Sequence, residues 1–366
     1  MADYAALIPV NVVTGFLGSG KTTLLNRLLR SPQLARTAVL VNEFGEVGLD
    51  HLLLEKVDAE TVILQSGCVC CTIRGDLAEA IRALFGRRER GVIPGFDRLA
   101  IETTGLADPA PIVATLLAEP VIRHHFRLGN VITTVDAVNG ALHLAENPES
   151  LKQVAVADRV VLTKTELAAD TRVAQLRTAL SRLNPTAPIL HASDPLAPDD
   201  LMASDVYDPK RKSAEVRRWL DEEAQRAAAG DLRAVAQADD PVVVAGQRPH
   251  HRPDPNRHDR DIHAFCLTFA EPLDWTAFGI WLTMLLHAHG ARVLRVKGIL
   301  NVLGLATPVV IHGVQHVVHP PAHLEVWPDA DRRSRIVFIV RGLDQSAIER
   351  SLAAFHRQAD PARDAA

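Results

Sequence analysis

One segment of the chain combines glycines, a lysine and a hydroxyl group at the spacing that binds phosphate. Residues 15–22, GFLGSGKT, match the pattern G-x-x-x-x-G-K-[ST]. The glycines let the backbone fold closely around phosphate oxygens with its N–H groups pointing inward. We expect Lys21 to neutralise the β- and γ-phosphates and the hydroxyl of Thr22 to bind Mg²⁺. The predicted nucleotide-contacting residues of this segment are Gly15, Gly18, Ser19, Gly20, Lys21, Thr22 and Thr23.

The segments on either side of this loop agree with that interpretation. Residues 8–13 predict a buried strand, and residues 23–29 predict the first turns of a helix. The N-terminus of that helix would add partial positive charge beside the phosphates. The alternative is a glycine-rich turn with an incidental lysine, which the order of strand, loop and helix disfavours.

A second nucleotide signal is the sequence LAIETTG at residues 99–105. An apolar strand ends in Glu102, and an acid at this place in phosphate-loop enzymes holds Mg²⁺, usually through water. Gly105 would let a backbone N–H approach the γ-phosphate, a contact that hydrolysis removes. We therefore assign catalytic roles to Lys21, Thr22, Glu102 and Gly105. The alternative is a solvated strand end.

A third signal, TKTE at residues 163–166, follows a predicted strand. It is similar to the [NT]-K-x-D motif with which GTPases bind guanine. The acid would accept hydrogen bonds from guanine, and adenine would leave it unpaired. Thr163, Lys164 and Glu166 are thus predicted to bind the base. Glu166 is one methylene longer than the usual Asp, which leaves the strictness of guanine specificity open, and a charged helix start is the alternative.

Three of the four cysteines lie within four positions: Cys68, Cys70 and Cys71. Neighbours so close are poor disulfide partners, and three thiolates suit Zn²⁺ or another divalent transition metal such as Co²⁺. Three ligands leave a tetrahedral position open, as expected of a carrier site or a catalytic site. Small buried cysteines at a strand end are the alternative.

The composition places the chain among ordinary globular proteins. It has 366 residues, 47% hydrophobic and 23% charged, with a net charge of −4. This balance does not indicate nucleic-acid or membrane binding, and no apolar run approaches the length of a membrane helix. Because the N-terminus does not resemble a signal peptide, we expect a cytoplasmic protein. The oligomeric state stays open.

The pattern of elements predicts an α/β fold in two parts. Residues 1–194 alternate strands with helices, which indicates a mostly parallel sheet typical of a P-loop GTPase domain. Residues 195–261 are expected to form a linker with one helix and a flexible His-rich loop. Residues 262–357 predict a smaller C-terminal α+β domain, and 358–366 a tail.

Taken together, the motifs resemble the CobW-type metallochaperone GTPases, relatives of the HypB and UreG nickel-insertion GTPases. They occur in order as GFLGSGKTTLLN, VNEFGE, GCVCC, IETTGLADP, VDAV and TKTE, with RVKGIL and GVQH in the C-terminal part. The resemblance implies GTP binding, slow hydrolysis, a Zn²⁺-like ion at the C-x-C-C motif, and delivery of that metal to a client metalloprotein.

Further candidate metal ligands are less specific. Glu43 and Glu46, in a predicted switch loop, are candidate ligands of the metal or of Mg²⁺-bound water, or else solvated loop acids. Ten of the sixteen histidines lie between His250 and His323, which suits weak metal capture or incidental loop composition.

Two other functions remain open on the sequence alone. In one, the chain is an NTP-dependent enzyme activator with structural cysteines. In the other, it stores or buffers metal, and nucleotide has no control over metal binding. The sequence does not identify the physiological metal or the client.

Overall fold

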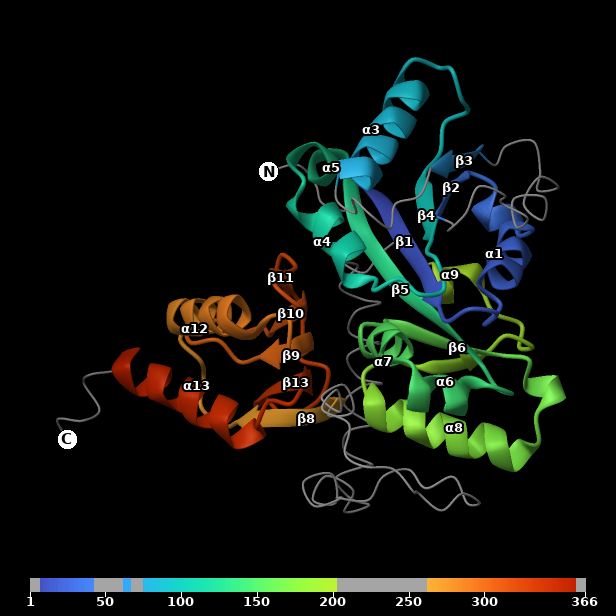
Figure 1. Cartoon of the computed structure of the whole chain (residues 1–366). Helices are drawn as coiled ribbons and strands as arrows, with labels where there is room; N and C mark the ends of the chain where they lie inside the picture. Colours follow the sequence, from blue (N-terminus) through green and yellow to red (C-terminus); the bar gives the residue numbers. More distant parts are fainter. Residues whose placement is uncertain (1–6, 43–61, 67–74, 203–261, 360–366) are drawn as a thin grey trace.

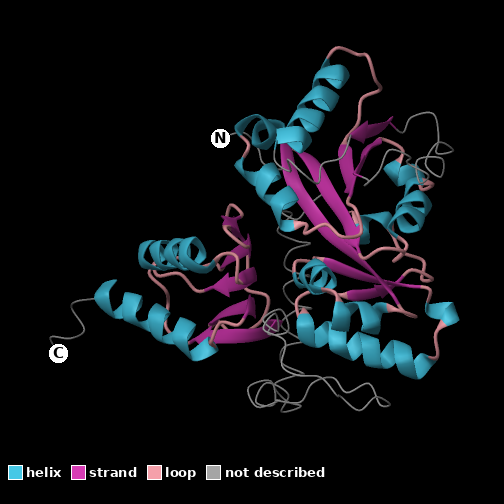
Figure 2. Cartoon of the chain, viewed as in Figure 1, coloured by secondary structure: helices cyan, strands magenta, loops and turns pink. Residues whose placement is uncertain are grey.

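The computed structural model describes residues 7–42, 62–66, 75–202 and 262–359 of the 366-residue chain. Two sheets dominate these residues, a parallel sheet in the N-terminal part and an antiparallel sheet in the C-terminal part (Figures 1 and 2). This arrangement confirms the predicted fold class. Within these ranges, no helix combines the length and apolar character that crossing a membrane requires.

The N-terminal sheet has seven strands in the order β3-β2-β4-β1-β5-β6-β7, all paired in parallel. Its strands are β1 (Ile8–Gly15), β2 (Thr37–Asn42), β3 (Val62–Ser66), β4 (Arg98–Glu102), β5 (Phe126–Asp136), β6 (Arg159–Thr163) and β7 (Ile189–His191). Strand β1 lies at the centre, so the predicted phosphate loop follows the middle strand. Crossover helices between parallel strands place such loops at the carboxyl edge of the sheet.

Helices cover both faces of this sheet. They are α1 (Lys21–Leu29), α3 (Gly75–Glu89), α4 (Ala110–Ala118), α5 (Pro120–His125), α6 (Gly140–Glu146), α7 (Pro148–Ala155), α8 (Asp170–Leu183) and α9 (Pro198–Leu201), with 3₁₀ turns at Pro32–Leu34 and Thr165–Leu167. Helix α1 packs on one face, whereas α3, α4, α7 and α8 pack on the other. Alternate residues of the central strands therefore pack against helices on opposite faces of the sheet.

Strand β5 is longer than its sequence suggests. The pattern predicts a strand over 131–135, but the strand begins at Phe126 and includes a register shift opposite Val10 and Val12 of β1. Asn11, fully buried, fills the irregularity by accepting a hydrogen bond from the Asn130 N–H at 2.9 Å. A polar stretch thus stays inside the sheet because buried side chains satisfy its backbone groups.

The C-terminal domain is an antiparallel sheet covered on one face by two helices. Its elements are β8 (Ile262–Phe269), α12 (Trp275–His289), β9 (Val293–Leu300), β10 (Val309–Val314), β11 (Val317–Val318), β12 (Ala322–His323), β13 (Ser334–Arg341) and α13 (Gln345–Ala359). The buried indole of Trp281 donates to the Ser351 hydroxyl at 3.1 Å and joins the two helices. Helix α13 continues one residue past Gln358, where the sequence predicts the tail to begin.

The other face of the antiparallel sheet meets the N-terminal domain. Leu294 and Ile339 pack with Ala155 at the end of α7, and Val314 joins the core beneath α4. In Figure 1, helices α12 and α13 lie on one side of the antiparallel sheet, and the N-terminal domain lies on the other side. The sheet is therefore buried on both faces near β9.

Helix α9 lies inside the segment that the sequence predicts to be a linker. Leu201 and Met202 are nevertheless fully buried against α1, and the Leu201 carbonyl accepts a 2.7 Å hydrogen bond from Asn130. An apolar pair in a polar stretch thus completes the N-terminal core. The predicted helix over 213–229 and the histidines at 250–258 lie outside the described residues.

Candidate nucleotide site

The strand order brings the predicted nucleotide motifs to one edge of the parallel sheet. In the register of the sheet, Glu102 of β4 lies beside Val13 of β1, and Thr134 of β5 lies beside Gly15. On the next strand, Thr163 of β6 lies beside Asp136. Four adjacent strands, β4, β1, β5 and β6, therefore end together with the polar residues that the sequence singles out.

The phosphate loop is closely packed against its neighbours. Gly15 has φ +142°, and a Cβ there would overlap the Thr134 hydroxyl. The Ser19 hydroxyl hydrogen-bonds that of Thr134 at 2.7 Å, and the Thr163 hydroxyl donates to the Ser19 carbonyl at 2.7 Å. Gly20 caps α1 in the left-handed conformation, with φ 88°. These contacts shape a backbone cradle that only glycine accommodates at Gly15.

Lysine and hydroxyl groups lie where the motif requires them. The Lys21 ammonium donates to the carbonyls of Gly15 at 3.1 Å and Phe16 at 3.2 Å, so it lies over the loop. The Thr22 hydroxyl donates to the Glu102 carboxylate at 2.5 Å. Glu102 is only 4% exposed, so this oxygen pair lies in a sheltered place beside the loop. Hydroxyl and carboxylate oxygens are suitable donors for Mg²⁺.

The segment after β4 lies directly on the phosphate loop. The Thr103 N–H donates to the Val13 carbonyl at 3.0 Å, and its hydroxyl donates to that of Thr14 at 2.8 Å. Gly105 approaches Leu17 so closely that a Cβ would lie 2.6 Å from the Leu17 nitrogen. The residue predicted to contact the γ-phosphate is therefore adjacent to the phosphate loop.

The residues predicted to bind the base follow β6. Thr163 is buried, while Glu166 is exposed in the 3₁₀ turn Thr165–Leu167. Lys164 has a left-handed backbone, with φ 55°, and its ammonium pairs with the Asp136 carboxylate at 2.7 Å. The structure thus directs Lys164 towards the end of β5 and leaves the Glu166 side chain on the surface beside it.

Asp136, at the end of β5, accepts several hydrogen bonds. It belongs to the motif VDAV, but the sequence assigns it no role. Its other oxygen accepts from the Val138 N–H at 2.7 Å and the Asn139 N–H at 3.3 Å. Burial alone would raise the pKa of Asp136. The hydrogen bonds from Lys164, Val138 and Asn139 outweigh burial and hold that pKa below its ordinary value. Asp136 is therefore an anion that positions Lys164.

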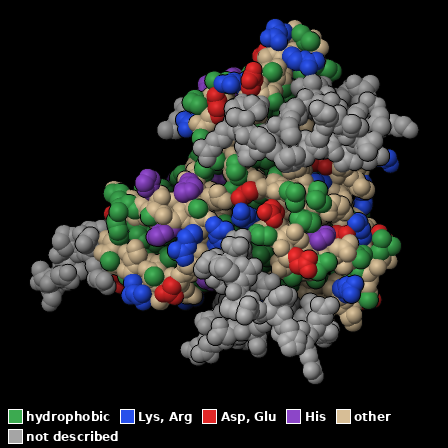
Figure 3. All heavy atoms as spheres, viewed as in Figure 1, with side chains coloured by type: hydrophobic (Ala, Val, Ile, Leu, Met, Phe, Trp, Pro, Cys, Tyr) green, Lys and Arg blue, Asp and Glu red, His purple; other side chains and the backbone are tan. Residues whose placement is uncertain are grey.

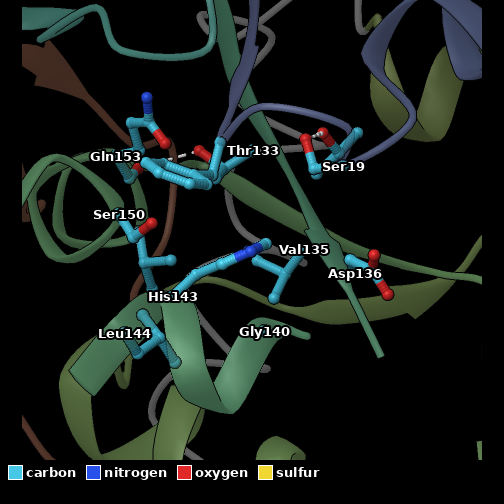
Figure 4. Close-up of a pocket in the computed structure, with 12 residues that line it drawn as sticks. Ser19, Thr133, Val135, Asp136, Gly140, His143, Leu144, Ser150 and Gln153 are labelled. Carbon is cyan, nitrogen blue, oxygen red and sulfur yellow. Dashed lines mark hydrogen bonds between the residues drawn. The ribbon is translucent and has the colours of Figure 1, made fainter. Parts of the chain in front are cut away.

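A small cavity lies between the phosphate loop and helices α6 and α7 (Figure 4). It is lined by Ser19, Asp136, His143, Ser150 and Gln153 among others. The rings of Phe16 and His143 lie 4.6 Å apart across this region. Figure 4 shows the amide nitrogen of Gln153 pointing away from the other side chains that line the cavity. Helices α6 and α7 carry no recognisable motif in the sequence, because their apolar patterns are short.

The candidate metal ligands lie mostly outside the described residues. These are Glu43, Glu46, Cys68, Cys70 and Cys71. Strand β2 ends at Asn42 and β3 ends at Ser66, so both segments follow strands of the parallel sheet at its carboxyl edge. Within the described ranges, no three His, Cys, Asp or Glu side chains gather closely enough to hold a metal ion. The histidines visible in Figure 3 are scattered.

Two known protein families match this chain, and the first is a nucleotide-binding family. Residues 9–191 match the family described as CobW/HypB/UreG, nucleotide-binding domain. Residues 262–356 match the family described as cobalamin synthesis protein cobW C-terminal domain. The chain belongs to the CobW/HypB/UreG family. Its N-terminal domain is the family's nucleotide-binding domain, and its antiparallel domain is the CobW C-terminal domain.

Two proteins with curated descriptions are similar to about half of the chain. It is 40% identical over 182 residues to the zinc chaperone YjiA of Escherichia coli, which covers 50% of the chain and 56% of YjiA. It is 32% identical over 193 residues to the zinc-regulated GTPase metalloprotein activator 1 of Schizosaccharomyces pombe, covering 51% and 46%. The matches thus span about half the length of these relatives.

A solved family structure matches both domains. The Zn(II)-bound YjiA GTPase from E. coli is 26% identical, with a TM-score of 0.65 over 95% of the chain and 99% of that structure. A Zn(II)-bound triple mutant of the same GTPase gives a TM-score of 0.66. The CobW architecture of two adjoining domains is therefore shared along almost the whole chain.

Proposed function

We propose that the chain is a slow GTPase that binds a transition metal, zinc above all, and delivers it to a client metalloprotein under control of the GTP cycle. The observation that carries the nucleotide part is the convergence of Lys21, Thr22 and Glu102 at the end of β1 and β4. Membership of the CobW/HypB/UreG family supports it independently.

The residues fit Mg·GTP as follows. The glycine cradle and Lys21 would bind the phosphates, with Lys21 leaving the loop carbonyls to meet the γ-phosphate. Thr22 and Glu102 would hold Mg²⁺, which would offset the charge that develops during hydrolysis. Gly105 would present a backbone N–H to the γ-phosphate. Thr163, Lys164 and Glu166 would bind guanine, with Asp136 holding Lys164 in place.

The metal part of the proposal rests on the three-thiol motif and on the relatives. Cys68, Cys70 and Cys71 would bind the metal and leave one position open for Glu43, Glu46 or a client ligand. Of the two relatives named above, one is described as a zinc chaperone and the other as a zinc-regulated GTPase metalloprotein activator. Because free thiols must lose protons to bind metal, affinity should weaken as pH falls.

Two titrations test these parts separately. GTP should bind more tightly than ATP and be hydrolysed slowly, because no arginine finger is identifiable in the sequence. Equal affinity for GTP and ATP would reject a guanine-specific site. One Zn²⁺ should bind per chain, and a variant with Cys68, Cys70 and Cys71 all replaced by Ser should lose this site. Full tight stoichiometry in that variant would assign the metal to other residues and favour structural cysteines.

A further inference from the structure

Helix α7 carries a buried side chain that holds the segment after β4. Gln153 is 1% exposed, and its amide nitrogen donates to the carbonyls of Gly105 at 3.1 Å and Ala107 at 3.0 Å. Both partners are acceptors, so the nitrogen of the amide must face them. The backbone carbonyl of Gln153 accepts a hydrogen bond from the Thr133 hydroxyl of β5 at 2.8 Å, drawn as a dashed line in Figure 4.

The segment that Gln153 holds is the one nearest the phosphate loop. Gly105 has no room for a Cβ against the Leu17 nitrogen. Thr103, two residues earlier, is bonded to the end of β1. Gln153 therefore completes a set of contacts that presses residues 103–107 onto the loop. A backbone held in this way is already ordered before a γ-phosphate reaches it.

The end of the same helix contacts the C-terminal domain. Val156, one turn after Gln153, offers its carbonyl to the buried guanidinium of Arg295. Asp158 pairs with the same guanidinium, and with the Lys297 ammonium at 3.3 Å. Arg295 and Lys297 both lie on β9. One short segment, 153–158, therefore contacts the predicted γ-phosphate loop at one end and the second domain at the other.

We propose that helix α7 couples the loop after β4 to the C-terminal domain, with Gln153 as the positioning residue of that loop. The proposal rests on the proposed nucleotide function. Gln153 holds Gly105 in place for the triphosphate, and the Arg295–Asp158 contact holds α7 in place for Gln153. Docking of β9 therefore favours the triphosphate, and by linkage the triphosphate favours docking.

The first test measures the affinity of the full chain for GDP and for a non-hydrolysable GTP analogue by titration. Gln153→Met keeps the side-chain volume and removes both hydrogen bonds to the loop. We expect it to weaken analogue binding by roughly 10-fold, as the loss of one or two hydrogen bonds implies. GDP, which lacks the γ-phosphate, should bind within about 2-fold of wild type. Equal weakening of both ligands, or no weakening, would overturn the proposal.

A matched control lies one turn earlier on α7. Ser150 is 5% exposed, lines the same cavity, and its hydroxyl has no hydrogen-bond partner in the described ranges. Ser150→Ala should leave the ratio of analogue to GDP affinity unchanged. A Ser150→Ala effect as large as that of Gln153→Met would show that any perturbation of α7 lowers the ratio. If Gln153→Met does not fold, Gln153→Asn is too short to span both carbonyls and gives the same expectation.

A double-mutant cycle tests transmission along the helix. Arg295 lies at the opposite end of α7 from the loop after β4. Arg295→Met should lower the ratio of analogue affinity to GDP affinity by roughly 5-fold. In a chain that already carries Gln153→Met, the same substitution should lower that ratio little further. Multiplicative effects, or no effect of Arg295→Met, would mean that the two ends act independently. A wild-type chain that binds neither nucleotide would overturn the proposed function as well. Normal binding of both with independent effects would overturn the coupling alone.

Discussion

The two sheets of the molecule place their polar side chains in different positions. In the parallel sheet, Glu102, Asp136 and Thr163 stand at the carboxyl ends of adjacent strands. In the antiparallel sheet, Arg295 and Lys297 stand in the middle of β9 and are 3% and 6% exposed. Both sets are buried, but the first lies at the edge of the sheet where a ligand would bind, whereas the second is covered by the neighbouring domain.

This difference follows from topology. Parallel strands joined by helices leave a crevice beyond their carboxyl ends, so polar residues there remain available for a ligand. Charges in mid-strand are buried once another layer packs on the sheet, so they need fixed partners. Substitutions at the strand ends should therefore change nucleotide chemistry without unfolding the chain. Substitutions at the charges of the domain contact should mainly lower stability, and should alter triphosphate binding only indirectly, through α7.

The largest effect is expected at the strand-end site. Lys21→Ala should lower GTP turnover by roughly 1000-fold, because the charge developing on the γ-phosphate loses its main counter-charge. The melting temperature should stay close to wild type, since the Lys21 ammonium donates to carbonyls of the phosphate loop and is not part of the apolar core. Arg172→Ala, an exposed cation of α8, is the control and should keep full turnover. Undiminished turnover in Lys21→Ala would remove the phosphate loop from the mechanism.

At the domain contact, we expect a substitution to lower stability and to leave GDP affinity nearly unchanged. Asp158→Ala leaves two buried cations without their carboxylate and should lower the free energy of unfolding by about 3 kcal/mol. GDP affinity should change by less than about 2-fold, because Asp158 makes no contact with the phosphate loop. Denaturant titration measures the first quantity and nucleotide titration the second. Unchanged stability would show that the contact is not part of the folded core.

A smaller effect is expected where the base would bind. Glu166 is exposed, so its contribution should be limited. Glu166→Ala should reduce the preference for GTP over ATP by roughly 10-fold, or about 1.4 kcal/mol. Competition binding with both nucleotides measures it. A preference that survives intact would assign guanine recognition to another residue.

The smallest effect is expected for the stability that Asp158 contributes, which should change little with pH near neutrality. Burial alone would raise the pKa of Asp158, but Arg295 and Lys297 outweigh it and lower that pKa far below the ordinary value. A depressed folded pKa contributes stability above the unfolded value of about 4 and loses it as pH falls further. The stability difference between wild type and Asp158→Asn should therefore be constant from pH 8 to 5 and shrink below pH 4. A decline near pH 6 would contradict this ionisation.

The regular elements are the parts of the fold that sequence patterns predict well. The strand predicted over 8–13 and the helix predicted over 23–29 lie within β1 and α1, because each has a clear apolar pattern beside the glycine-rich loop. The first half of β5 was missed because Arg127, Gly129 and Asn130 break its pattern, and Asn11 compensates from another strand. Helices α5, α6 and α7 were missed because they are short, and short helices give weak periodic signals.

Some residues of the candidate site could be predicted from the sequence, and others could not. Lys21 and Thr22 could be predicted because their motif is local in the sequence. Gln153 and Asp158 could not, since their partners are Gly105, Ala107, Arg295 and Lys297, between 46 and 139 residues away. Only the folded sheet brings them together. Residues that a local motif defines are accessible to sequence reasoning, whereas side chains that join distant segments require the structure.

A single Zn²⁺ titration can show whether nucleotide state controls the proposed metal site. Zn²⁺ is titrated into the full chain loaded with GDP and, separately, with a non-hydrolysable GTP analogue. Strand β3, which precedes the C-x-C-C motif in the sequence, ends at the same sheet edge as Glu102. We therefore predict a difference in Zn²⁺ binding free energy of about 1–3 kcal/mol between the two states, with tighter binding to the analogue-loaded protein. Identical affinities would contradict a GTP-controlled metallochaperone even if both sites bind their ligands.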